Sequence, residues 1–311
     1  MMLARSASAQ TCTGGAFVAD ACRKTVDLVN FLTPQLATAQ AGGNAMLGQG
    51  GALGGFGRVA VDIRVSAVFG SLPRLGGAGF SSAESSSSFA SESHLIPALS
   101  ANAAIGLWRG ISLGVTHVGG VDALVTATYL QNFRSDGVSG QVGGSEQFGY
   151  GVRIGVLEES VLSPGVALTW LKRDLPTLAV TATVPGSGAA NPGGTISVTD
   201  YSIKTSAWRV TAAKTFPGFG ALSAGVGQDQ YGSDSRVAVN VNGGGTANGL
   251  ASMTMRRTSF FGSVSINVVV AKLVLELGRV AGGNTPLLLN DFGSASNASR
   301  TYCTAGLRAS F

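Results

Sequence analysis

The residues of this chain that could carry out acid–base or nucleophilic chemistry are few. Two histidines occur in 311 residues. His94 follows Ser93 and His117 follows Thr116, but adjacent strand residues point to opposite faces, so neither pair converges as lipid hydrolysis requires. Nothing in the sequence places the carboxylates of an Asp–His protease beside His94, and no Cys or His spacing forms a metal-ligand set. We therefore predict no enzymatic activity, no metal site and no cofactor.

A second group of ionisable residues alternates with apolar residues along extended segments, so these charges share one face of each strand. If that face encloses an interior, positive charge is in excess there. One interpretation is a network of salt bridges that fills a narrow interior, because isolated buried charges are costly. The other is a path lined by unpaired arginines that favours anions. The predicted interior charges are Arg58, Asp62, Arg64, Asp122, Arg153, Arg209, Asp229, Lys272, Glu276, Arg300 and Arg308.

The segments that carry these charges repeat a period of two. Val61 and Ile63 alternate with Asp62 and Arg64, and the final segment, 299–311, alternates in the same way and ends on Phe311. The polar faces hold mainly Gly, Ser, Thr, Ala and isolated Arg, where a soluble sheet would show Lys and Glu. Small groups of this kind suit the crowded inside of a closed barrel.

Composition supports a membrane location. The chain is 45% apolar and only 12% charged, about half the charged share of an ordinary soluble domain, and its mean hydropathy is +0.30. The most apolar stretch, 264–280, is interrupted by Asn267, Lys272, Glu276 and Arg279, so a helical span is not expected. A closed barrel is the other solution that lipid permits, and 46 glycines argue against a helical bundle.

Turn signals between the alternating segments predict an all-β fold, a closed antiparallel transmembrane β-barrel of about ten strands. Longer, polar connections alternate with shorter ones, as in barrels with outside loops and periplasmic turns. Twelve strands is the alternative, because 162–184 and 194–240 are long enough to contain further hairpins. The predicted strands are 56–71, 94–108, 120–133, 145–157, 162–184, 194–215, 219–240, 251–269, 271–282 and 299–311.

The amino-terminal region divides the chain into three parts. Residues 1–10 end in a small-residue pattern of the kind that a signal peptidase cuts after, and are interpreted as a signal-peptide remnant. Residues 11–55 hold a short helix that Pro34 ends, followed by a glycine-rich loop. They form either a periplasmic tail or a plug inside the barrel, which is residues 56–311. The plug candidates are Val26, Val29, Leu32, Gly43 and Asn44.

The three cysteines allow one disulfide. Cys12 and Cys22 enclose a short loop in what should be an oxidising compartment, so a bond between them fits the pattern. Cys303 stands in the register predicted to face lipid, where it would pack as a small apolar residue.

The aromatic-terminated closing strand resembles that of bacterial outer-membrane β-barrel proteins. The apolar amino-terminal segment with the Gly43 to Ala45 stretch is similar, over about thirty residues, to FadL-type transporters of hydrophobic compounds, whose amino terminus forms a hatch. The resemblance implies an integral outer-membrane location, contact with outer-membrane lipid, and recognition of the closing strand by the barrel-assembly machinery. That family is longer and has fourteen strands, so its substrate-binding residues are not carried over.

These features support two hypotheses of function. The first is passage or uptake of small compounds, hydrophobic or anionic, through a barrel occluded by its amino terminus. The alternative is a structural or adhesive surface protein whose lumen is packed and does not conduct. No basic cluster indicates a nucleic-acid partner.

Overall fold

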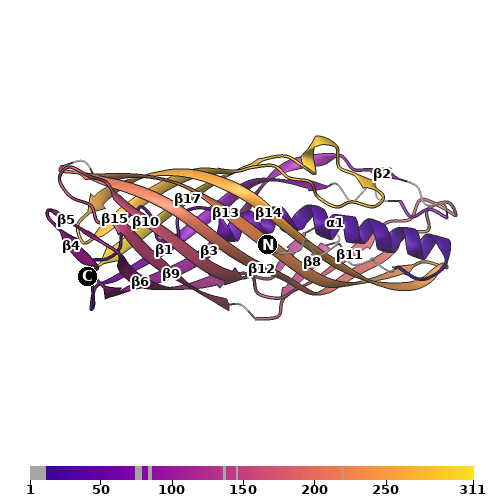
Figure 1. The fold of residues 1–311 in the computed structure, drawn as a ribbon. Coiled ribbons are helices and arrows are strands. Elements are labelled where there is room, and N and C mark those ends of the chain that lie inside the picture. The colour runs from indigo at the N-terminus through magenta and orange to yellow at the C-terminus, as the bar shows by residue number, and fades with distance from the viewer. Residues whose placement is uncertain (1–11, 74–78, 83–85, 136–137, 145, 219) are drawn as a thin grey trace, which may run out of the picture.

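The computed structural model describes residues 12–73, 79–82, 86–135, 138–144, 146–218 and 220–311, so the predicted signal-peptide remnant, 1–10, lies outside the described residues. A 26-residue helix and long antiparallel strands form an elongated barrel (Figure 1). The elements are α1 (Ala16–Ala41), β1 (Val59–Pro73), β2 (Ser87–Ser88), β3 (Ser91–Trp108), β4 (Ile111–Leu113), β5 (Thr116–Val118), β6 (Gly120–Tyr129), β7 (Phe133–Ser135), β8 (Val138–Val142), β9 (Glu146–Leu157), β10 (Gly165–Asp174), β11 (Leu178–Val184), β12 (Gly194–Phe216), β13 (Gly220–Val241), β14 (Gly245–Val268), β15 (Ala271–Val280), β16 (Asn290–Asp291), the 3-10 helix η2 (Gly293–Ala295) and β17 (Arg300–Ser310).

Within the described residues, ten strands pair in a closed antiparallel ring, which confirms the predicted fold class. Its order is β1, β3, β6, β9, β10, β12, β13, β14, β15 and β17, and β17 pairs back onto β1. The predicted strand 162–184 is interrupted at Pro176, which has no backbone donor for the ladder. Both halves, β10 and β11, pair with β12, and β11 continues sideways to β8 and β7 beyond the ring.

The two ends of the barrel differ. The carboxyl terminus lies at the end that carries the tight turns β12–β13 and β14–β15, whereas the connections β1–β3 and β15–β17 at the other end are long. Short turns are periplasmic in outer-membrane barrels, so the long connections are extracellular. The predicted loop 241–250 is wrong: β13 and β14 continue to a pair between Val241 and Gly245, because Val239, Val241 and Ala247 pack inward around α1.

The faces of the wall that carry apolar and polar residues change places along the strands, and the part with an apolar outer face marks the membrane-spanning segment. β12, β13 and β14 have 23, 22 and 24 residues, about twice what a bilayer requires. In their periplasmic halves the outward residues are apolar and the inward ones polar; beyond Trp208 and Phe260 the outward residues become polar and the inward ones apolar. Exposed aromatic side chains lie at this boundary: Phe69, Phe148, Tyr150, Trp170, Trp208 and Phe260.

Helix α1 lies inside the barrel and contacts β1, β3, β12, β13, β14 and β17. The prediction that Pro34 ends the helix is wrong, since the helix continues to Ala41. A proline inside a helix removes one backbone hydrogen bond; here the wall surrounds the helix, and Pro34 is itself buried. Thr38 Oγ1 donates to the Pro34 carbonyl at 2.7 Å.

Candidate functional site

The chain from Cys12 to Arg58, called the plug here, runs down the lumen from the extracellular end to the periplasmic rim. Gly14 lies beside Ala247 near the β13–β14 turn. Farther down, the backbone N–H of Leu53 donates to both carboxylate oxygens of Asp122 at 3.1 Å. At the rim, Val59 and Phe311 exchange backbone hydrogen bonds. The plug therefore fills the barrel along its length.

The extracellular half of the plug packs as an apolar core. Val26 and Phe31 of α1 are almost fully buried against wall residues such as Ile203 and Val239. The Phe31 ring stacks on Phe292 of the β15–β17 connection with centroids 4.2 Å apart. Contacts of this kind hold a helix in place independently of salt and pH, so this half is the stable part of the plug.

The predicted plug residues and two of the three cysteines fall in this region or directly below it. Cys12 and Cys22 form a disulfide at the amino-terminal end of α1. Val26 and Val29 are buried on α1, and Leu32 is partly buried against the same core. Gly43 and Asn44 are buried just below the helix. Cys303 is unpaired and partly exposed on the outer face of β17.

Charged residues of α1 hold two extracellular connections against the helix. Asp27 accepts the backbone N–H groups of Leu288, Leu289 and Asn290 at 2.6, 2.7 and 2.8 Å. Asp20 accepts the N–H of Ser81 at 2.9 Å and pairs with Lys24 at the same distance. The helix thus closes the extracellular end through its loops as well as through its own bulk.

Asp27 gives this closure a dependence on pH. Burial raises the pKa of its carboxyl above the ordinary value, although the three backbone donors oppose the shift. The stability that this group contributes is therefore complete below the ordinary carboxyl pKa near 4 and is lost as the pH rises through the raised value. We expect the thermal unfolding temperature to fall over that range in the parent chain and this component to disappear in Asp27→Asn. Asp20→Asn is the control that removes a neighbouring helix carboxylate; an unchanged pH profile in Asp27→Asn would contradict the assignment.

Below α1 the plug is bound by polar groups of the wall. Four arginines donate to plug carbonyls: Arg209 to Ala41 and Gly43, Arg173 to Gln40, Arg64 to Asn44, and Arg308 to Leu47. The first of these carbonyls belong to the carboxyl end of α1, where the helix dipole favours cations. Each guanidinium thus satisfies a carbonyl that the last turn of the helix or the irregular loop leaves free.

Three wall carboxylates complete the arrangement by accepting plug N–H groups. Glu276 accepts from Asn44 at 3.2 Å, Asp62 accepts from Leu47 at 3.2 Å, and Asp122 accepts from Leu53. Together these donors and acceptors form hydrogen bonds with the backbone of the plug rather than with its side chains. We call this set the latch: Arg64, Arg173, Arg209, Arg308, Asp62, Asp122 and Glu276.

The inner face of the wall, which includes the latch, carries an excess of positive charge. Two ion pairs, Arg153 with Asp122 and Arg209 with Asp229, are almost fully buried. Among the described strand residues, seven buried arginines stand against four buried carboxylates: Arg64, Arg153, Arg173, Arg209, Arg257, Arg300 and Arg308 against Asp62, Asp122, Asp229 and Glu276. Several of their polar atoms, including Nε and Nη2 of Arg173, have no protein partner, so this part of the lumen is suited to hydration.

Most of the eleven predicted interior charges face the inside of the wall. Nine of them are buried inside; Lys272 is partly exposed near the periplasmic rim. Arg58 is a correction: it precedes β1 at the rim and is exposed, because the strand begins only at Val59. Sequence analysis missed Arg173 and Arg257, although Arg173 alternates with the outward residues Trp170 and Lys172 in a way that could have revealed it.

The two histidines lie at opposite ends of the barrel. His94 is exposed near the extracellular end, 3.6 Å from Glu92, and His117 contacts Glu158 at 2.7 Å on the periplasmic side. In the described part of the chain, no three His, Cys, Asp or Glu side chains gather as a metal site. Among the same residues, no helix has the length and apolar character needed to cross a membrane.

The fold and the site define the class of protein. A closed ten-stranded antiparallel wall, an apolar outer band edged by aromatic side chains and a polar interior are the features of a transmembrane β-barrel. The chain is an integral protein of the bacterial outer membrane.

Comparison with known proteins supports the barrel architecture and identifies no family. No protein-family model and no curated protein matches the chain. Among solved structures it is similar to the outer membrane protease OmpT from Escherichia coli (TM-score 0.39, 10% identity, 82% of this chain and 97% of that one). It is also similar to the Pseudomonas putida toluene transporter TodX (TM-score 0.30, 10% identity, 81% and 87%) and to the transport unit of the Escherichia coli autotransporter AIDA-I (TM-score 0.34, 9% identity, 92% and 99%).

Proposed function

We propose that this barrel is a gated path for small solutes across the outer membrane, closed at rest by the plug. The observation that carries the proposal is the latch. In the membrane-spanning part of the lumen, the wall charges bind mainly the plug backbone, so displacement of the plug would leave a charged surface that water can solvate. A barrel that served only as a solid anchor could be filled with apolar side chains, which stabilise a buried interior at least as well as buried charges do.

A closed resting state is supported by the fit of the plug to the wall. The cavity enclosed by the plug and the wall near Arg173, Thr205 and Arg209 has a volume of about 10 Å³, which is room for one water molecule. Passage therefore requires the plug to move.

We place the first movement in residues 42–58. This segment is glycine-rich and is bound largely by hydrogen bonds that water can replace, with a small apolar cluster around Ala45 and Met46. By contrast, α1 is held by a larger apolar core, a disulfide and two extracellular connections. The excess of arginine favours small anions over the hydrophobic compounds that the amino-terminal resemblance suggests, because a charged wall disfavours apolar solutes.

Planar-bilayer recordings test this function. We expect the full chain to be silent and a chain lacking residues 11–50 to show discrete openings with a reversal potential that reports preference for anions. Both proteins must first be shown to fold as heat-modifiable barrels. Silence of a correctly folded truncated barrel would contradict the proposal.

The alternative function is a structural or adhesive surface protein. It is favoured by the extracellular half, where α1, the disulfide and the β15–β17 connection form a packed unit above the membrane. The same recordings separate the two functions, because a purely structural barrel has no reason to present a selective path once its plug is removed.

A further inference from the structure

Three cations face outward on β12, β14 and β15 at the extracellular edge of the apolar band. Lys204 on β12, Arg256 on β14 and Arg279 on β15 are all exposed. Arg279 pairs in register with Phe260, and Arg256 lies four residues from Phe260 toward the extracellular end. The three side chains therefore stand at and just above the aromatic boundary, at the level of the outer-leaflet headgroups.

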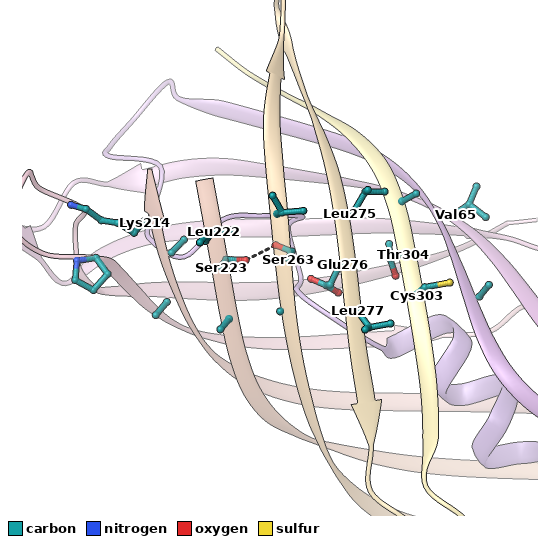
Figure 2. Close-up of a pocket in the computed structure, with 18 residues that line it drawn as sticks. Val65, Lys214, Leu222, Ser223, Ser263, Leu275, Glu276, Leu277, Cys303 and Thr304 are labelled. Atoms are coloured by element: carbon teal, nitrogen blue, oxygen red, sulfur yellow. Dashed lines mark hydrogen bonds between the residues drawn. The ribbon is translucent and has the colours of Figure 1, made fainter. Parts of the chain in front are cut away.

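Directly below Arg279, the outer wall has a broad apolar groove of approximately 1030 Å³, which reaches Lys214 near the periplasmic end of β12. Figure 2 shows its lining across β12 to β17 and β1, with Leu222, Leu275, Leu277 and Cys303 among the labelled residues. Small residues form its floor: Ala212, Ala224, Gly262 and Ala305. The inward hydroxyls of Ser223 and Ser263 bond to each other behind it at 2.6 Å.

The groove and the cations belong to one surface. Gly262 on the groove floor lies two residues below Phe260 on β14, and Leu277 at the groove edge lies two residues below Arg279 on β15. A molecule that placed apolar chains in the groove would therefore bring its headgroup to the cations. This is the arrangement of an amphipathic lipid whose headgroup is anionic.

We propose that this surface binds one molecule of lipid A, the phosphorylated glycolipid anchor of the outer leaflet, with acyl chains in the groove and phosphates on the cations. Strand geometry places Lys204 about 12 Å and Arg279 about 14 Å from Arg256, which is wider than a single phosphate and suits a headgroup with two. The register neighbours of the two arginines are uncharged, since Gln230 faces Arg256 and Thr301 faces Arg279. Lys204 instead faces Asp174 of β10, so the two arginines are the cations that a phosphate would neutralise.

The charge pattern disfavours a second copy of the chain as the occupant. Pairing this face with itself about a two-fold axis would bring the same patches together. The cations of one barrel would then meet those of the other, and like charges brought face to face disfavour association. A lipid phosphate instead neutralises them.

Native mass spectrometry of the full chain in detergent, with added lipid A, tests the proposal independently of any conductance. We expect affinity to fall about fivefold for each cation removed in Arg256→Gln and Arg279→Gln. The matched control is Arg236→Gln, an exposed outward cation on β13 farther from the band that pairs with Asp200; it should bind as the parent does. Gly262→Leu should also weaken binding by filling the groove, since a Cβ there meets its nearest atom at 3.7 Å and the wall need not move.

Phosphatidylglycerol, with one phosphate and two chains, is the competing lipid and should bind more weakly than lipid A. Unchanged lipid A binding in both arginine variants would overturn the proposal, as would equal losses in Arg236→Gln. Equal affinity for the two lipids would overturn the assignment to lipid A.

Discussion

Replacing Arg209 with Met is expected to destabilise the barrel by about 3–5 kcal/mol, the cost of breaking a buried ion pair from one side. Arg209 is 3% exposed and is the ion-pair partner of Asp229. Its guanidinium also donates to the carbonyls of Ala41 and Gly43. Methionine fills much of the same volume but leaves a buried carboxylate and two plug carbonyls without donors. Urea-dependent or thermal unfolding, followed by the shift between folded and unfolded bands on electrophoresis, measures the effect.

A second variant separates the ion pair from the plug contacts. Arg209→Met with Asp229→Leu removes both charges, and replacement of a buried pair by apolar groups is often neutral or stabilising. We expect the double variant to recover most of the lost stability. The plug carbonyls of Ala41 and Gly43 still lack their donors, so protease cleavage within residues 42–58 should remain faster than in the parent chain. A loss below about 1 kcal/mol in the single variant, the value for an exposed pair, would show that the pair is not enclosed as described.

The wall was predictable from sequence because a period of two is a direct consequence of strand geometry. Ten ring strands were predicted and found. The failures have local causes. At 241–250, glycines and asparagines resemble a loop, but β13 and β14 continue through them because alternate residues pack on α1, which no local pattern displays. At Pro34, the surrounding wall outweighs a helix-breaking residue.

The site was less accessible to sequence analysis than the wall. Inward charges could be listed from their register, but their partners could not, because the latch binds backbone N–H and C=O groups of the plug and every residue carries those alike. For the same reason, sequence left both a periplasmic tail and a luminal plug open for residues 11–55. Recognition of the closing strand and Phe311 by the assembly machinery stays a prediction.

Because the latch binds the plug backbone, a substitution that pushes this backbone away from the wall should open the barrel. Gly50 passes so close to β12 that a Cβ would overlap the backbone nitrogen of Ala213 and would lie 2.7 Å from the carbonyl carbon of Ala212. β12 cannot yield, because β10 and β13 pair with it along this stretch. Gly50→Ala must therefore lift the plug from the wall, at a cost of about 1–3 kcal/mol for overpacking.

The adjacent glycine supplies the matched control. A Cβ at Gly51 would meet its nearest atoms, Gly165 Cα and Leu157 O, at 3.8 Å, an ordinary contact. Both variants add one methyl group to neighbouring plug positions, so they differ only in whether the wall leaves room. We expect the full-length Gly50→Ala chain to open in planar bilayers while Gly51→Ala stays as silent as the parent. Openings in both, or destabilisation of Gly50→Ala without openings, would mean that residues 42–58 do not form the gate, since removing their fit to the wall would then not control the path.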